Sequence, residues 1–345
     1  MVVSASTFAD GNRADVPLPT GWEEIVAPVR PFLGRVAERL SAQVNCFEPE
    51  IAGYARYALN NQGKQLRPAL VALAGESVGP LNEELVSIAV IIEMIHLATL
   101  VHDDVMDAAT VRRRQPTLAA RWGNSVAVLV GDCLFAHALK LAADFLTTEV
   151  SRAVAESTGR VCTGEILQSH RRRRWDLTRA DYYKVLEMKT AELFALACSL
   201  GARMAGGGVA EQEALRRHGL ALGTAYQIFD DCLDVFGTEQ TAGKSLGTDL
   251  ATGKVTLPVL ICLERATPKD RAELLGWLND WQPGHYIAVR ALLERYEVLQ
   301  ESAAVIDGFL GTARDSLAGL PAGPGVTALG ALSQFLAQQT AALGG

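Results

Sequence analysis

Two groups of three aspartates have the residue type and spacing of a site for divalent cations. They are Asp103, Asp104 and Asp107 in EMIHLATLVHDDVMD, and Asp230, Asp231 and Asp234 in YQIFDDCLD. On a helix, residues four apart lie one turn apart on the same face, so each group is expected to point its carboxylates at one small volume. Two like charges 4 Å apart repel by roughly 4 kcal/mol at an effective dielectric near 20, so each group needs cations. Hard oxygen ligands suit Mg²⁺, which takes one or two carboxylates and completes its shell with water and substrate phosphate.

The repetition of the aspartate pattern is the stronger observation. A single acidic triplet is often a solvated helix face. Here both groups end apolar helical stretches, and the second repeats the spacing of the first. We therefore expect the two groups to form two walls of one cavity.

Basic residues near these aspartates indicate phosphate binding. Lys64 and Arg67 flank the start of a helix that begins near Pro68, and a helix N-terminus attracts anions. Arg112 and Arg113 follow the first aspartate group, and an arginine fork matches two phosphate oxygens. The alternatives are solvated cations at the helix start and simple charge balance beside the aspartates.

Three lysines extend this cationic set, namely Lys189, Lys244 and Lys254. Lys189 lies in an otherwise apolar stretch, where a lysine that snorkels to solvent is the alternative. The run of arginines at 171–174 is interpreted as a solvated loop. No activated Ser, Cys or His nucleophile stands out, so the chemistry that remains is stabilisation of a leaving diphosphate.

The elements that position these residues are predicted to be helices. The sequence is 49% hydrophobic and only 6% aromatic, which is material for a large core of aliphatic helices. Residues 1–20 lack periodicity and are expected to form a flexible tail, and 21–345 one all-helical domain. Residues 82–106 are predicted as the central helix, 125–146 as a buried helix and 212–236 as the helix of the second aspartate group. No strand pattern is evident.

Composition excludes several other classes. The net charge of -7 argues against non-specific nucleic-acid binding. The most apolar stretch, 85–101, contains Glu93 and His96 and is too polar for a membrane span. No signal peptide is evident, and the six cysteines have neither paired nor zinc-like spacing, so we expect buried thiols in the cytoplasm. GKS at 243–245 lacks the earlier glycine of a P-loop.

The order of motifs between about 62 and 258 resembles that of the trans-prenyltransferases, the polyprenyl diphosphate synthase family. GKQLRP resembles the family's GKRxRP, and HDDVMD followed by RRRQPT resembles its first aspartate-rich motif. KT, YQIFDDCLD and GKSLGTDLATGK resemble the remaining motifs. The resemblance implies an all-α, isoprenoid-synthase-like bundle of roughly a dozen helices around a deep central cavity. It also implies a homodimer that condenses isopentenyl diphosphate with an allylic diphosphate.

The resemblance also implies a role for each matching position. Mg²⁺, with three ions expected, would be bound by both aspartate groups. The isopentenyl diphosphate would be held by Lys64, Arg67, His96 and Arg113. The allylic diphosphate would be held by Arg112, Lys189, Lys244 and Lys254. Lys189, Thr190 and Gln227 would be the catalytic residues, the last two facing the developing cation. Gln65 replaces a usual Arg and Arg114 a usual Gly, which weakens the match at two substrate contacts.

Product length is predicted from the helix that precedes Asp103. A tail that grows back along this helix meets Ala98 and Thr99 one turn away and then Ile95, and one turn rises about 5.4 Å, close to one isoprene unit. Small residues here predict a product of about C30 to C50, with C20 to C25 as the alternative.

Competing interpretations are a terpene cyclase, a carboxylate-rich metal-binding bundle and a catalytically silent subunit. No stable membrane insertion is expected, although transient membrane contact would help product release.

Overall fold

The computed structural model describes residues 21–60, 63–113, 115–238 and 246–343. The described chain is almost entirely helical, which confirms the all-α prediction. The prediction that no strand occurs was wrong in one place. Val111–Arg112 (β1) pairs antiparallel with Gln115–Pro116 (β2), with Val111 opposite Pro116. A two-residue strand is too short to show an alternating pattern in a sequence.

Helices occupy the chain from Trp22 onward. In the first half they are α1 (Trp22–Ile25), α2 (Arg30–Ala42), α3 (Pro49–Asn60), α4 (Leu66–Glu76), α5 (Glu83–Met106), α6 (Leu118–Trp122), α7 (Asn124–Ala143) and α8 (Thr148–His170), with 3₁₀ turns at Ala27–Val29 and Gln43–Cys46. In the second half they are α9 (Arg179–Leu186), α10 (Glu192–Met204), α11 (Val209–Phe236), α13 (Thr248–Thr252), α14 (Leu257–Arg265), α15 (Pro268–Asn279), α16 (His285–Arg295), α17 (Val298–Asp315) and α18 (Pro324–Ala341).

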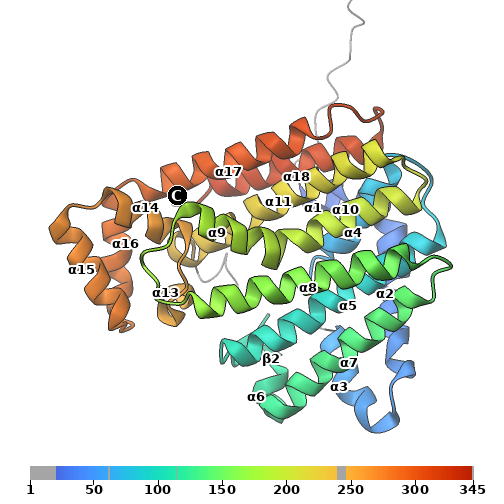
Figure 1. The fold of residues 1–345 in the computed structure, drawn as a ribbon, viewed down its shortest axis with the longest axis horizontal. Helices are drawn as coiled ribbons and strands as arrows, with labels where there is room; N and C mark the ends of the chain where they lie inside the picture. Colours follow the sequence, from blue (N-terminus) through green and yellow to red (C-terminus); the bar gives the residue numbers. More distant parts are fainter. Residues whose placement is uncertain (1–20, 61–62, 114, 239–245, 344–345) are drawn as a thin grey trace, which may run out of the picture.

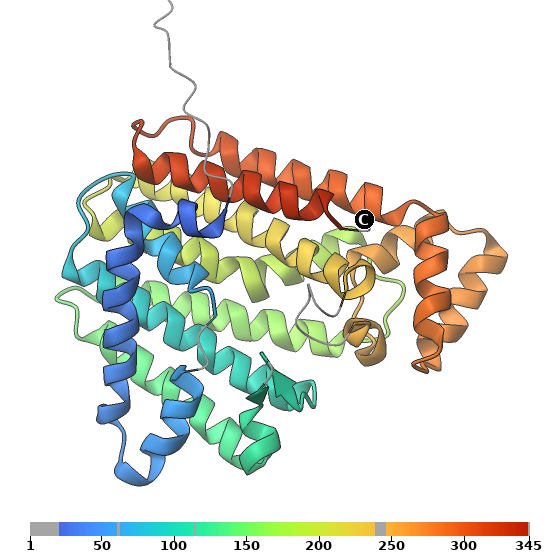
Figure 2. The same cartoon turned by 180° about the vertical axis from the view of Figure 1, so that it is seen from behind.

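Helix α5 is the central element, as predicted for 82–106. The side chain of Asn82 caps its start by accepting a hydrogen bond from the backbone N–H of Leu85 at 2.9 Å. It packs against α2, α4, α7 and α10. Helices α11, α17 and α18 run side by side above it, while α14 to α16 lie at one end of the bundle and α2 and α3 at the other (Figures 1 and 2).

A π-helical segment, Glu187–Ala191, separates α9 from α10. Its position coincides with Lys189 and Thr190. Gly164 of α8 lies directly against it, because a Cβ there would come within 2.7 Å of the backbone nitrogen of Lys189. π-Bulges in helices occur frequently at functional sites. A capping box formed by Thr178 and Asp181 begins α9.

Two helices of the described chain, α5 and α7, are long and apolar enough to cross a membrane. In α5, 72% of the apolar window is buried inside the fold, so α5 is a core helix. In α7 only 39% is buried, and Leu129 is 63% exposed and Leu139 40% exposed. The prediction of a fully buried helix here was therefore wrong, because one apolar face of α7 has no partner within the described chain.

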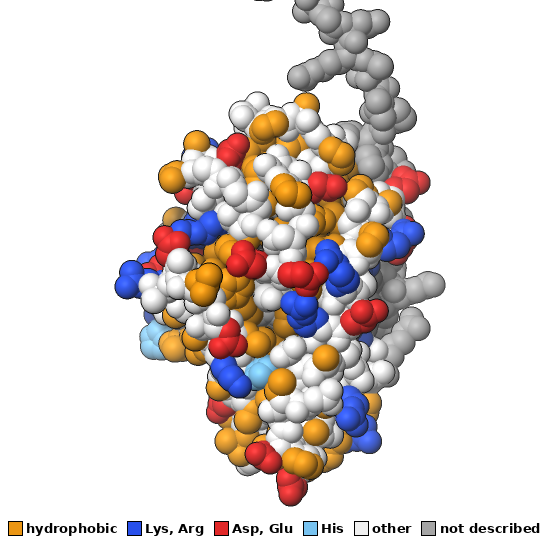
Figure 3. All heavy atoms as spheres, turned by 90° about the vertical axis from the view of Figure 1, so that its right-hand side faces the viewer, with side chains coloured by type: hydrophobic (Ala, Val, Ile, Leu, Met, Phe, Trp, Pro, Cys, Tyr) orange, Lys and Arg blue, Asp and Glu red, His pale blue; other side chains and the backbone are white. Residues whose placement is uncertain are grey.

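Charge on the surface is mixed. On the face that Figure 3 shows, at the α2 end of the bundle, acidic and basic side chains alternate with apolar ones and no basic patch forms. This agrees with the net charge of -7. Among the cysteines, Cys198, Cys232 and Cys262 are buried as predicted, whereas Cys46 and Cys162 are exposed.

Candidate active site

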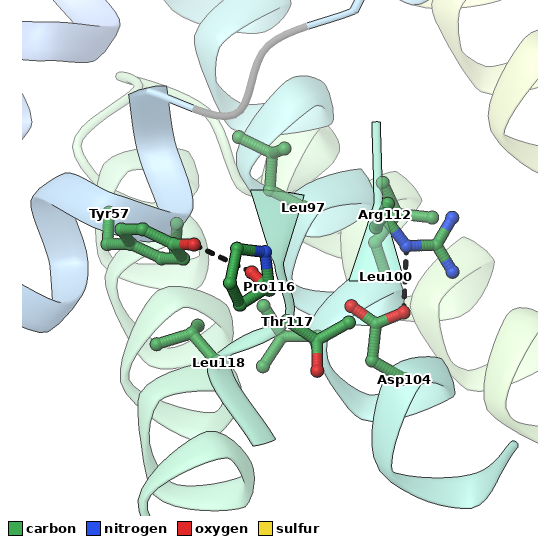
Figure 4. A pocket seen from close by; sticks show the side chains of 10 residues that line it. Tyr57, Leu97, Leu100, Asp104, Arg112, Pro116, Thr117 and Leu118 are labelled. Carbon is green, nitrogen blue, oxygen red and sulfur yellow. Dashed lines mark hydrogen bonds and ion pairs between the residues drawn. The ribbon is translucent and has the colours of Figure 1, made fainter. Parts of the chain in front are cut away.

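The first aspartate group divides between two sides of α5. Asp103 and Asp107 face basic residues of other elements: Asp103 lies 3.8 Å from the ammonium of Lys189, and Asp107 lies 2.8 Å from that of Lys254. Asp104 instead accepts a hydrogen bond of 2.8 Å from Arg112, beside the β1–β2 hairpin (Figure 4). The expectation that all three carboxylates point at one volume was wrong, because Asp104 lies about 100° around the helix from Asp103.

The pKa values of the two inner carboxylates shift in opposite directions, because the nearby cations outweigh burial only at Asp107. Burial raises the pKa of Asp103 to about 6; Lys189 opposes this, while Glu165 and Asp107 add to it. Burial would also raise the pKa of Asp107, but Lys254, Lys189 and Arg172 outweigh it and hold that pKa below its usual value. The site therefore buries several carboxylates close together, which makes the negatively charged form of Asp103 unfavourable. Carboxylate oxygens clustered in this way are suitable ligands for a divalent cation.

The second aspartate group lies at the C-terminal end of α11 and is also divided. Asp231 is buried and accepts hydrogen bonds from Tyr182 at 2.7 Å and from the amide of Gln227 at 2.9 Å. Burial, reinforced by Asp249, raises the pKa of Asp231 to about 8. Thr190 donates to the carbonyl oxygen of Gln227 at 2.8 Å, so Thr190, Gln227 and Asp231 form one hydrogen-bonded chain.

Asp234 contacts a different element. Its carboxylate accepts hydrogen bonds from the hydroxyl of Thr248 at 2.8 Å and the backbone N–H of Asp249 at 3.0 Å, at the start of α13. This geometry makes Asp234 a cap for α13. Its assignment as a metal ligand stays a prediction.

The two groups belong to one site. Lys254, which follows α13, lies 2.8 Å from Asp107 and 3.4 Å from Asp249, and Asp249 in turn influences the pKa of Asp231. The ammonium of Lys189 contacts Glu165 and Gln168 of α8 as well as Asp103. The two groups are therefore joined through Lys254 and α13 and do not lie on opposite exteriors. Within the described residues, no group of three or more His, Cys, Asp or Glu side chains is arranged so that it could hold a metal ion by itself.

A cavity of about 550 Å³ lies between α4, α5, α11 and α18 and is lined by the predicted cations Lys64, Arg67 and Arg113. Lys64, Arg67, His96, Arg113 and Asp230 all line it. The guanidinium of Arg67 also stacks over the ring of Phe194, with 5.0 Å from its carbon to the ring centre. Burial, together with Arg67, Arg113 and Arg112, lowers the pKa of His96 well below its usual value, so His96 is neutral. A cluster of cations in a concave, partly apolar pocket is suited to a diphosphate with a short hydrocarbon tail.

The sequence did not predict Glu93 or Tyr182 as residues of the site. Glu93 is only 3% exposed and lines the cavity; burial raises its pKa, and Arg67 and Arg113 oppose that rise. A charged residue inside an apolar helix was the signal that could have identified it, since buried carboxylates are normally paired. Tyr182, far from Asp231 in sequence, had no such signal.

The residues predicted to set product length lie apart from this cavity. Ala98 and Ile95 are fully buried in α5, and the hydroxyl of Thr99 donates to the backbone carbonyl of His96 at 2.7 Å. None of the three lines the cavity around Arg67. Their role stays a prediction. Lys244 and Arg114 lie outside the described residues.

The family model for polyprenyl synthetase matches residues 48–294, which span both aspartate groups and the cationic cavity. The chain belongs to the polyprenyl synthetase family. It is similar to the nonaprenyl diphosphate synthase of Mycobacterium tuberculosis, at 35% identity over 90% of this chain and 92% of that protein. It is also similar to the short chain isoprenyl diphosphate synthase of Methanothermobacter thermautotrophicus, at 32% identity over 92% of this chain and 99% of that protein.

A solved structure supports the same assignment. The polyprenyl synthase of Caulobacter crescentus, complexed with calcium and isoprenyl diphosphate, superimposes with a TM-score of 0.88 at 32% identity, covering 93% of this chain and 99% of that one. The fold is therefore that of the isoprenoid synthases. As a polyprenyl synthetase, the chain is a prenyltransferase, and the interpretation as a metal-binding bundle is set aside.

Proposed function

We propose that this polyprenyl synthetase condenses isopentenyl diphosphate with an allylic diphosphate in a Mg²⁺-dependent reaction. The observation that carries the proposal is the presence of two separate cationic groups at one site. Arg67, Arg113 and Lys64 line the cavity, whereas Lys189 and Lys254 lie against the aspartates of α5. Two diphosphate substrates require two such groups.

Asp103 and Asp107 on one side, and Asp230 on the other, are the carboxylates placed to hold Mg²⁺, with three ions proposed. Asp230 reaches the cavity, and Asp103 and Asp107 face Lys189 and Lys254. When bound, Mg²⁺ supplies positive charge that stabilises a departing diphosphate. Asp104, Asp231 and Asp234 have protein partners in this structure and complete the groups by orienting their neighbours.

The chain's own residues then account for the bond changes. Lys189 and Lys254 stabilise the diphosphate that leaves with the electron pair of the allylic C–O bond. The hydroxyl of Thr190 donates a hydrogen bond to Gln227, which leaves the lone pairs of its oxygen available to stabilise the allylic cation. Arg67 and Arg113 hold the diphosphate of isopentenyl diphosphate, and its double bond attacks that cation to form the C–C bond. The isopentenyl unit then loses a proton to the released diphosphate, so no protein base is needed.

The proposed product is about C30 to C50, on the reasoning from helix rise that one turn spans one isoprene unit. The nonaprenyl synthase among the relatives supports this range, and the short chain relative supports the alternative of C20 to C25. Replacing Ala98 by Phe places a ring one turn before Asp103 and should shift products toward shorter chains, as resolved by extraction and chromatography. Because Ala98 is fully buried, Ala98→Val controls for overpacking. An unchanged distribution in a folded Ala98→Phe variant contradicts this gating.

The proposed assembly is a homodimer in the cytoplasm. The apolar face of α7, with Val128, Leu129 and Leu139 exposed, is the described surface best suited to a second copy. The same face is suited to transient membrane contact during release of a long product. Sedimentation in detergent-free buffer distinguishes a dimer from a monomer.

The decisive experiment supplies substrates one at a time. With an allylic diphosphate alone, the enzyme should release no hydrocarbon, and product should form only after isopentenyl diphosphate is added. A terpene cyclase would release hydrocarbon from the allylic substrate alone, and a catalytically silent subunit would remain inactive with both. Either result contradicts the proposed function. The repeated aspartate pattern at Asp230 favours the synthase.

A further inference from the structure

One arginine of the run at 171–174 lies inside the site. The guanidinium of Arg172 donates to one oxygen of Asp107 at 2.7 Å, while Lys254 contacts the other oxygen at 2.8 Å. The two side chains are similarly enclosed, at 25% and 15% exposed. The prediction that this run is a solvated loop was therefore wrong for Arg172. Arg172 holds a position equivalent to that of Lys254, which is a predicted ligand of the allylic diphosphate.

Backbone contacts fix this placement. The N–H of Arg173 donates to the carbonyl of Gly253 at 2.7 Å, so the loop that carries Arg172 is joined to the loop that carries Lys254. Gly253 has a φ of +73°, and a Cβ there would lie 2.5 Å from the Cγ of Arg173. This close approach requires glycine. The hydrogen bond between these two loops thus positions both Arg172 and Lys254 beside Asp107.

The neighbouring arginines point elsewhere. Arg171 donates a hydrogen bond to Asp181 in the first turn of α9. Arg174 pairs with Asp176 on the surface at 2.9 Å. Arg173 packs on Gly253 and reaches the carbonyl of Asn279. Arg172 alone in this run approaches the aspartates of α5.

Arg172 retains hydrogen-bonding capacity that the described residues do not use. A guanidinium has five N–H donors, and the Nε of Arg172 is buried without a hydrogen-bond partner among the described residues. A buried donor without a partner destabilises the state that contains it. A ligand with several acceptor oxygens at this position would remove that destabilisation. Diphosphate provides such oxygens in the geometry that a guanidinium fork matches.

We propose that Arg172 is a further ligand of the allylic diphosphate, additional to Lys189 and Lys254. The inference rests on the proposed function, since it places the allylic substrate beside Asp103 and Asp107. In the substrate-free enzyme Arg172 balances the charge of Asp107. On binding, it contacts phosphate oxygens and stabilises the diphosphate as it leaves.

The test compares Arg172→Gln with Arg174→Gln, a matched control from the same loop that points away from the site. Binding of inorganic diphosphate in the presence of Mg²⁺ is measured by calorimetry on the full chain. Arg172→Gln should weaken diphosphate binding about 10- to 100-fold, the range for loss of one charge-assisted contact, and Arg172→Lys should recover part of it. Arg174→Gln should bind like the wild type. Melting temperatures confirm that each variant is folded.

Steady-state kinetics give the second measurement. The KM for the allylic substrate should rise about 10-fold or more in Arg172→Gln, with the KM for isopentenyl diphosphate within about twofold of wild type. Unchanged diphosphate binding together with tighter Mg²⁺ binding would show that Arg172 is only a counter-ion of Asp107, and would overturn the proposal. Equal rises in both KM values would overturn it as well. If the wild type binds diphosphate but condenses nothing, the proposed function fails, while the binding comparison still decides the role of Arg172.

Discussion

Replacing Asp107 by Asn is expected to lower kcat/KM for condensation by about 10³-fold, equivalent to about 4 kcal/mol of transition-state stabilisation. Asp107 is the carboxylate on which Arg172 and Lys254 converge, at 2.7 and 2.8 Å. Asparagine keeps the shape of the side chain but removes the charge that is proposed to hold Mg²⁺ and that pairs with these two cations. The loss should therefore fall mainly on kcat, measured with saturating isopentenyl and allylic diphosphates.

Asp104→Asn is the matched control for this prediction. Asp104 belongs to the same triplet, but its hydrogen-bond partner is Arg112 on another side of α5. We expect the fold-loss of kcat/KM in Asp104→Asn to be at least 10 times smaller than the fold-loss in Asp107→Asn. Equal losses in the two variants would contradict the division of the triplet. Excess Mg²⁺ should not restore Asp107→Asn to wild-type activity, since the orienting role of the carboxylate is also lost.

The different contacts made within each aspartate group show which features of the site could be predicted from the sequence and which could not. Spacing alone predicted that Asp103 and Asp107 share a face, because the period of a helix is fixed. It did not predict where α5 packs, and packing decides that Asp104 meets Arg112 near the hairpin while Asp103 meets Lys189. The orientation of a helix about its own axis depends on contacts with other elements, and these are distant in the sequence.

The same limit explains why the sequence did not predict the contacts of Tyr182, Asp234 and Arg172. Tyr182 reaches Asp231 across 49 residues of chain, and Arg172 reaches Asp107 across 65. Asp234 caps α13, a five-residue helix too short for a periodic signal. The overall all-α fold, the central helix and the cationic cavity were predictable because each depends on local periodicity or on motif order. Contacts between residues far apart in the sequence, such as those made by loops, are indicated neither by local periodicity nor by motif order.

Replacing Arg67 by Met should raise the KM for isopentenyl diphosphate about 100-fold, with the KM for the allylic substrate changed by less than about threefold. Arg67 is partly buried, lines the cavity and stacks on Phe194 at 5.0 Å. Methionine retains much of the apolar stem, so packing on Phe194 is preserved while the charge is lost. A rise shared equally by both substrates would contradict the assignment of this cavity to isopentenyl diphosphate.

Loss of Arg67 should also lower the free energy of unfolding, because the buried Glu93 loses a compensating charge. This effect can be measured separately from substrate binding. Glu93 is buried, and Arg67 is the largest favourable influence opposing the burial that raises the pKa of Glu93. Without Arg67 the buried carboxylate of Glu93 loses the main positive charge that offsets its burial, and a buried charge left uncompensated costs up to about 3–5 kcal/mol. The double variant Arg67→Met, Glu93→Gln removes that charge and should regain most of the lost denaturation midpoint, whereas the KM for isopentenyl diphosphate stays about 100-fold raised. A double variant that recovers KM together with stability would show that Arg67 acts only through folding, because a ligand contact cannot be restored by removing Glu93.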